Sequence, residues 1–154
     1  MAISGVTTFL WFDDQALEAA TFYVGTFPDS RLGQVTHYPA DGQRPEGSVL
    51  TVEFSLFGQS FVALNGGPGF PHNESVSFQV FCDTQDEVDS LWDTLTSHGG
   101  EEGRCAWCKD RWGVSWQVVP RTLGELLASS DPAVSKKALD AMMTMGKIEI
   151  ERLR

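Results

Sequence analysis

Apolar and polar positions along the first half of the chain predict four strands and one helix. The predicted strands are residues 3–12, 30–38, 48–58 and 59–66. The last two form a hairpin that turns near Gly58. After the first strand, Leu17, Ala20 and Val24 have helical spacing. We expect Asp13 or Asp14 to cap this helix, which ends at Pro28.

The same order of elements recurs after residues 66–74, a segment of three glycines and two prolines that we interpret as a linker. The predicted strands of this half are residues 75–83, 101–110 and 114–120. A helix over 84–100 places Val88, Leu91, Trp92 and Leu95 on one side. One further strand is needed for this half to match the first.

Direct comparison of the two halves indicates an internal repeat. At an offset of 69 residues, Phe9 aligns with Phe78 and Phe12 with Phe81. At an offset of 55, residues 57–64 align with residues 112–119. We therefore predict an α+β fold of paired βαβββ modules, at about 3–65 and 75–120, within a domain of residues 1–121.

Residues 122–154 form a helical extension of different character. The sequence predicts one short helix over 122–129 and a second over 130–145, with Ser130 as N-cap and Pro132 in the first turn. Leu139 and the methionines of this helix make an apolar surface, for which packing on the domain is favoured over a subunit contact.

Composition restricts the partners. The 154 residues carry a formal net charge of −10, and basic residues are not clustered, so we expect no nucleic-acid partner. No apolar run approaches the ~20 residues that span a bilayer, so no membrane partner is expected. The N-terminus lacks the pattern of a signal peptide, and the three cysteines are an odd number. Both features favour a reducing, cytoplasmic location.

The stretches that carry a family resemblance are "FLWFDDQALEAATFYVGTFPDS", "FVALNGGPGF", "ESVSFQVFCDTQDEVDSLW", "CAWCKDRWGVSWQVVP" and "ASSDPAVSKKALDAMMTM". In this order the chain resembles the PhnB-like branch of the vicinal-oxygen-chelate superfamily, which includes glyoxalase I, bleomycin-resistance proteins and extradiol dioxygenases. Members of this branch often carry the label 3-demethylubiquinone-9 3-methyltransferase. Common methyltransferases use a Gly-rich turn before a helix, whereas a predicted strand follows "NGGPG" here.

The resemblance implies that, in metal-using members, each module supplies two ligands to one divalent ion. The corresponding positions here are Thr7 or Thr8, Val62, Ser75 or Ser77, and Gln117. Valine cannot bind a metal, and neutral hydroxyls are poor ligands beside carboxylate or imidazole. We therefore expect no metal and no cofactor.

The remaining candidate metal ligands and nucleophiles do not change this expectation. His37, His72 and His98 have the spacing of no known ligand motif. Cys105 and Cys108 form a C-x-x-C, but in a strand-like segment rather than before a helix, so we interpret both as structural, with redox sensing as the alternative.

The resemblance predicts a concave, mainly apolar pocket with a few neutral polar groups. The candidate pocket residues are Thr8, Trp11, Ser77, Trp107 and Gln117. Gln117 is equally explained as a half-buried side chain that bonds to a serine and a threonine. The favoured function is metal-free binding of a small molecule by a homodimer. The alternatives are an enzyme of the superfamily, for which Glu53 is the candidate titratable group, and a structural dimer without a ligand.

Overall fold

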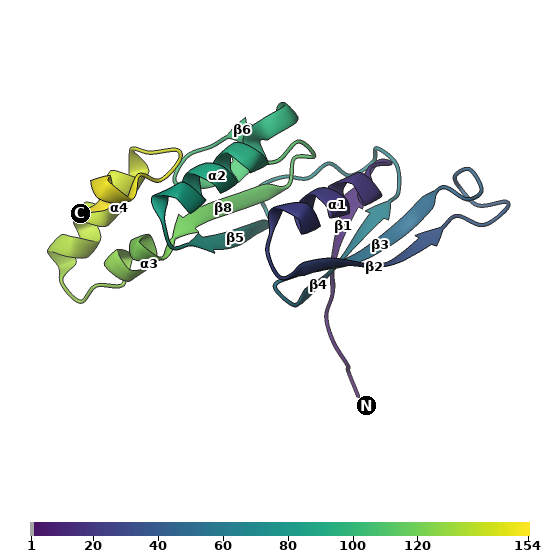
Figure 1. The fold of residues 1–154 in the computed structure, drawn as a ribbon, viewed down its shortest axis with the longest axis horizontal. Coiled ribbons are helices and arrows are strands. Elements are labelled where there is room, and N and C mark those ends of the chain that lie inside the picture. Colours follow the sequence, from purple (N-terminus) through teal and green to yellow (C-terminus); the bar gives the residue numbers. More distant parts are fainter. Residues whose placement is uncertain (1) are drawn as a thin grey trace. The chain divides into compact units, whose positions relative to one another are not determined.

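The computed structural model describes residues 2–154, which divide into two compact units between Pro71 and His72. The first unit is a four-stranded sheet with one helix packed on it (Figure 1). Its elements are β1 (Thr8–Phe12), α1 (Ala16–Thr26), β2 (Ser30–His37), β3 (Val49–Leu56) and β4 (Gln59–Asn65). The strand order is β1-β4-β3-β2; β1 runs parallel to β4, and the other pairs are antiparallel.

The second unit repeats this architecture and adds the C-terminal helices (Figure 1). Its sheet has the equivalent order β5-β8-β7-β6. Its elements are β5 (Ser77–Cys82), α2 (Gln85–Thr96), a short 3-10 turn (Ser97–Gly99), β6 (Glu101–Glu102), β7 (Trp107–Lys109), β8 (Ser115–Pro120), α3 (Arg121–Leu127), α4 (Pro132–Met143) and a C-terminal 3-10 turn (Ile150–Leu153). The α+β class and the paired βαβββ order are thus confirmed.

The strand expected in the second half is found inside the segment predicted as one strand, residues 101–110. A tight turn divides that segment into β6 and β7, closed by a 3.0 Å bond from the amide of Trp107 to the carbonyl of Arg104. Cys105 and Ala106, at the centre of the turn, both have positive φ, a conformation that favours glycine or asparagine. The missing glycine is why the sequence did not indicate this turn.

The helix α1 begins differently from the prediction. Its N-cap is Gln15, not Asp13 or Asp14, and the Gln15 side chain makes no capping bond. Instead, Oδ1 of the buried Asn65, at the end of β4, accepts a 2.8 Å bond from the amide of Ala16. Asn65 also donates to the carbonyl of Val49, so one side chain ties the helix to two strands.

The strand register corrects the predicted alignment of the two modules. Phe61 pairs with Thr8, and its equivalent at the confirmed offset of 55, Trp116, pairs with Phe78. Thr8 is therefore equivalent to Phe78, at an offset of 70 rather than 69. The offset of 69 was wrong because it matched aromatic residues that stand on opposite faces of their strands.

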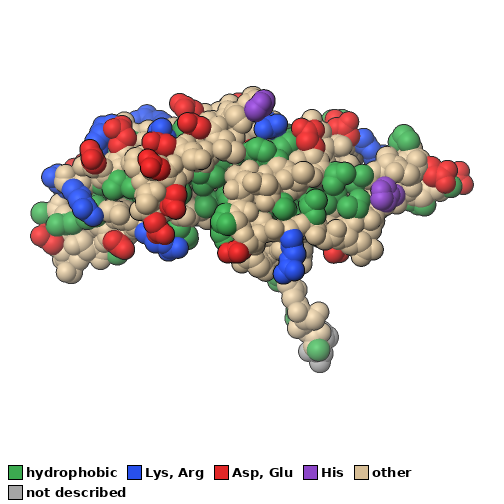
Figure 2. All heavy atoms as spheres, in the orientation of Figure 1, with side chains coloured by type: hydrophobic (Ala, Val, Ile, Leu, Met, Phe, Trp, Pro, Cys, Tyr) green, Lys and Arg blue, Asp and Glu red, His purple; other side chains and the backbone are tan. Residues whose placement is uncertain are grey.

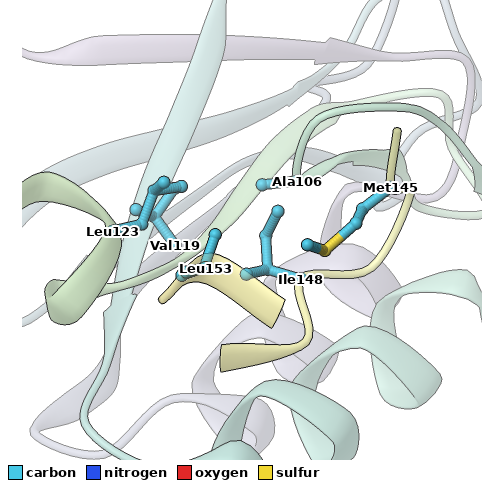
Figure 3. Packing of buried hydrophobic residues seen from close by; sticks show 6 residues of the cluster. All are labelled: Ala106, Val119, Leu123, Met145, Ile148 and Leu153. Atoms are coloured by element: carbon cyan, nitrogen blue, oxygen red, sulfur yellow. The ribbon is translucent and has the colours of Figure 1, made fainter. Parts of the chain in front are cut away.

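The C-terminal extension closes the second unit with an apolar cluster (Figure 3). The cluster consists of Ala106, Val119, Leu123, Met145, Ile148 and Leu153. Met145 is buried there, whereas Leu139 and Met143 remain exposed on α4. The N-cap of α4 is Asp131 instead of Ser130; its carboxylate accepts a 2.9 Å bond from the amide of Ala133.

Candidate functional site

Each sheet has one face packed against its helix and one face turned away from it, which we call the open face. In β1, Leu10 and Phe12 are buried toward α1, while Phe9 between them is 60% exposed. Alternation then places Trp11, like Phe9, on the open face. In β8, Trp116 and Val118 point toward α2, so Gln117 lies on the open face of the second sheet.

On the open face of the first sheet, strand pairing sets side chains in rows across the strands. One row is polar: Arg31 pairs with Ser55, and Ser55 pairs with Ser60. The next row has Glu53 beside Val62, which in turn pairs with Phe9. A Cβ added to Gly33 would lie 3.1 Å from the Cβ of Glu53, so a larger residue at position 33 would crowd Glu53.

A cavity of about 350 Å³ lies over these two rows. Its lining residues are Thr7, Arg31, Leu32, Gly33, Glu53, Phe54, Ser55, Ser60, Phe61 and Val62. The lining combines one cation, one carboxylate and three hydroxyls with apolar side chains. This arrangement can bind a small molecule of mixed polarity.

The open face of the second sheet has the equivalent rows. Ser77 pairs with Ser115, which pairs with Lys109, and Gln117 pairs with Trp107. The side-chain amide of Gln117 donates a 2.8 Å bond to the hydroxyl of Ser77.

A smaller cavity, of about 190 Å³, occupies the corresponding place. Its lining residues are Glu74, Glu101, Glu102, Gly103, Trp107, Cys108, Lys109 and Ser115. Lys109 pairs with Glu74 at 2.6 Å, and this hydrogen bond lowers the pKa of Glu74 and raises the pKa of Lys109. The cation of this cavity is thus already neutralised, and the remaining lining is acidic.

The structure places the five predicted pocket residues in different surroundings. Ser77, Trp107 and Gln117 come together on the second open face. Trp11 is on the first open face, where its indole N–H donates 2.8 Å to the carbonyl of Gly67 and its ring meets Phe70 edge-on at 4.9 Å. Thr8 is half-buried in register with Phe61, on the α1 side of the sheet.

Thr7, the alternative to Thr8, lines the larger cavity together with Val62 and Glu53. Sequence reasoning missed Arg31, Ser55 and Ser60. The signal for these residues is the hairpin register, which follows from the turn at Gly58 but needs the pairing of β2 with β3 as well.

The donor set at the ligand positions does not fit a divalent ion. At the corrected offset, Thr7 and Val62 of the first module are equivalent to Ser77 and Gln117 of the second. These positions offer two hydroxyls, one amide already bonded to Ser77, and a valine without a ligand atom. Across residues 2–154, histidine, cysteine, aspartate and glutamate nowhere form a group of three or more able to hold a metal.

The three cysteines are free thiols, and two of them are buried. Burial is the main cause that raises the pKa of Cys82 to about 11 and the pKa of Cys108 to about 12, and nearby carboxylates add to both shifts. Thiols with raised pKa values are poor nucleophiles, so Cys108 does not have the electrostatics of a redox-active C-x-x-C cysteine.

The segment Lys109–Pro120 owes its shape to Asp110, which is 2% exposed. Its Oδ1 accepts bonds from the amides of Trp112 (2.9 Å) and Val114 (3.1 Å), and its Oδ2 accepts 2.9 Å from the indole of Trp116. Gly113, with φ of 83°, completes the turn. Asp110 thus fixes the entry to β8 and with it the position of Gln117.

A family profile described as 3-demethylubiquinone-9 3-methyltransferase matches residues 4–119. A putative 3-demethylubiquinone-9 3-methyltransferase, PhnB protein, from Bacillus cereus has 29% identity and a TM-score of 0.68, covering 76% of this chain and 99% of its own.

More distant solved structures share the fold alone. Protein PA1353 from Pseudomonas aeruginosa has 19% identity and a TM-score of 0.59, with 77% of this chain and 98% of its own covered. The fosfomycin resistance protein FosX from Listeria monocytogenes has 16% identity and a TM-score of 0.56, with 84% and 100% covered. No curated protein matches the chain significantly.

Proposed function

Since the chain belongs to the family described as 3-demethylubiquinone-9 3-methyltransferase, the PhnB-like branch of the vicinal-oxygen-chelate superfamily, we propose that it binds a small, partly apolar molecule without a metal ion. The observation that carries the proposal is the 350 Å³ cavity on the open face of the first sheet. It contains Thr7 and Val62, two family ligand positions, but neither offers a carboxylate or an imidazole.

The family description itself does not determine the reaction. S-adenosylmethionine enzymes of the common type hold the cofactor at a glycine-rich turn that leads into a helix. Here the Gly-rich segment after Asn65 continues to β5, and no helix lies between Asn65 and Ser77 in the described chain. We therefore assign the cavity to binding and derive no methyl transfer.

A second candidate function is catalysis by an enzyme of the superfamily with Glu53 as general base. The observation that favours it is the position of Glu53 on the cavity wall, between Gly33 and Val62. A carboxylate beside bound substrate can accept a proton if the reacting C–H or O–H lies within hydrogen-bond reach. Glu53→Gln would abolish turnover but retain binding under this alternative.

We propose a homodimer as the assembly, with residues 1–121 as the glyoxalase-like domain and 122–154 as its extension. The exposed Phe9 and Phe81, on open faces of the two sheets, support an interface. Light scattering at several concentrations tests this, since a monomeric mass throughout would reject it.

Surface charge and the free thiols support the expected partners and location. Figure 2 shows acidic and basic side chains interspersed over the face that it draws, which supports a small molecule rather than nucleic acid as partner. The helices within residues 2–154 are too short or too polar to cross a membrane. Three free cysteines support a reducing, cytoplasmic location.

The experiment for the binding function is a screen of partly apolar small molecules by amide chemical shifts. Binders should shift the amides of Gly33, Ser55 and Val62. Val62→Phe, which extends a larger side chain into the cavity, should abolish these shifts, whereas Val134→Phe on α4 should leave them unchanged. If a molecule causes the same amide shifts in Val62→Phe and Val134→Phe, its binding site lies outside this cavity.

A further inference from the structure

We infer that the cavity on the first sheet takes a bifunctional small molecule, with an oxyanion at Arg31 and a hydrogen-bond donor, ammonium or hydroxyl, at Glu53. The inference rests on the proposed binding function and names the chemical class of its ligand. It depends on the arrangement of charges in one cavity and on the contrast with the equivalent cavity of the second unit.

The polar row of the cavity consists of hydrogen-bond donors. Arg31 pairs with Ser55, and Ser55 pairs with Ser60, so a guanidinium and two hydroxyls stand side by side. Thr7 adds a third hydroxyl from the segment before β1. A guanidinium binds carboxylate or phosphate oxygens with two parallel bonds, and neighbouring hydroxyls can satisfy the remaining lone pairs. This row suits an oxyanion.

Arg31 has no carboxylate partner within residues 2–154, unlike the three cations compared next. Arg44 pairs with Asp13 at 3.9 Å and Arg121 with Asp83 at 3.0 Å. In the equivalent cavity of the second unit, Lys109 pairs with Glu74 at 2.6 Å. The two modules thus present the same fold with different electrostatics: of these two cavities, only that of the first unit has a cation without a carboxylate partner.

Glu53 occupies the next row, diagonal to Arg31. Ser55 is the register partner of Arg31, and Glu53 lies two positions before it on β3, which separates the backbones by roughly 7–8 Å. Gly33, whose added Cβ would crowd the Cβ of Glu53, lies on one side of this residue, and Val62 pairs with it on the other. A donor group on the ligand therefore meets Glu53 a few bonds from the oxyanion.

The apolar part of the lining fits the segment between these two groups. Val62 is 8% exposed and, with Leu32, borders the cavity. A short hydrocarbon chain against these side chains gains about 0.8 kcal/mol per buried methylene. The ligand class is thus a short chain with an oxyanion at one end and a donor at the other.

The test uses four probes that share one carbon chain: 4-aminobutyrate, butyrate, butylamine and butanol. Amide chemical shifts of Gly33, Ser55 and Ser60 give the dissociation constants. We expect 4-aminobutyrate to bind most tightly. Arg31→Gln should weaken 4-aminobutyrate and butyrate about tenfold, the scale of one charge-assisted bond. Glu53→Gln should weaken 4-aminobutyrate and butylamine but not butyrate.

Arg44→Gln is the matched control, because it removes the same charge from the same unit outside the cavity. It should change no dissociation constant. The amide spectrum of each variant shows that it is folded. Equal weakening by Arg31→Gln and Arg44→Gln would indicate a general charge effect and overturn the inference.

The probes also distinguish failure of this inference from failure of the proposed binding function. If butanol shifts the cavity amides and the three charged probes do not, the ligand class is wrong while the binding function stands. If none of the four probes shifts these amides, both the ligand class and the proposed binding function are wrong. Shifts confined to the cavity of the second unit, around Trp107 and Ser115, would contradict both assignments as well.

Discussion

The side-chain amide of Gln117 donates a hydrogen bond to the hydroxyl of Ser77, 2.8 Å away on the adjacent parallel strand. These are the two positions of the second module that the family resemblance implies as metal ligands, and in this chain they bind each other. One explanation of Gln117 from the sequence is a half-buried amide bonded to a serine and a threonine; the structure shows the bond to the serine.

This bond should contribute measurably to stability. Ser77→Ala leaves a half-buried amide without its acceptor, which costs about 1 kcal/mol of unfolding free energy. Urea denaturation followed by tryptophan fluorescence measures the change, since Trp107 lies in register with Gln117. Ser60→Ala, at an exposed position of β4, is the control and should change little. Equal stability of both variants would mean that the bond does not form in solution.

Asp110 should be far less tolerant of substitution than Ser77. Asn in its place presents an N–H group to one of the three N–H donors that now point at carboxylate oxygens. We expect Asp110→Asn to lower the free energy of unfolding by about 2–3 kcal/mol.

The same urea titration measures this loss, and the exposed Asp41→Asn should lie within about 0.5 kcal/mol of the unchanged protein. If Asp110→Asn is as stable as Asp41→Asn, the buried carboxylate does not organise the turn.

The helix α1 provides a test of the corrected cap. Asn65→Ala removes the acceptor of the Ala16 amide and the donor to Val49, and should destabilise the first unit by about 1–3 kcal/mol. Asp14→Ala, at one of the two positions predicted from the sequence, should cost almost nothing because Gln15 is the N-cap. Amide hydrogen exchange along α1 distinguishes the two variants. Faster exchange in Asp14→Ala than in Asn65→Ala would restore the original prediction.

The thiols make stability depend on alkaline pH. The pKa values of Cys82 (about 11) and Cys108 (about 12) are raised above the ordinary 9.0, so the unfolded chain loses these protons first. The free energy of unfolding therefore falls as pH rises above about 9, until the folded thiols ionise as well. Cys108→Ala should flatten this fall between about pH 9 and 12, as urea denaturation at each pH would measure. A decline as steep as that of the unmodified protein would assign the effect to other groups.

The sequence predicted the fold well where the pattern was local. The alternation of β1, β4, β5 and β8 and the spacing of both main helices determine the module order, and the turns at Gly58 and Gly113 fix the offset of 55. It failed where a distant residue decides, since Asn65 caps a helix 49 positions earlier. It also failed where a local turn has unusual residues, since the β6–β7 turn has Cys105 and Ala106 where glycine is expected.

The candidate site shows the same contrast between residues predicted from a local pattern and residues that depend on distant strands. Gln117 and Ser77 were found from family positions on single strands. Arg31 was missed because two facts make it a candidate for ligand binding: it pairs with Ser55 on another strand, and it lacks a carboxylate partner. A linear sequence pattern reveals neither. The choice between Thr7 and Thr8 required the register of β1 against β4, because one residue reverses the face.

The central claim is that this PhnB-like chain binds its ligand without a metal, and thermal melting of metal-stripped protein with a panel of divalent ions tests it most directly. Tight binding to the folded state alone raises the midpoint by mass action. We predict that Zn²⁺, Ni²⁺ and Mn²⁺ leave the midpoint unchanged, in the unmodified protein and in Gln117→Ala alike. A clear rise with any of these ions that disappears in Gln117→Ala would contradict the account.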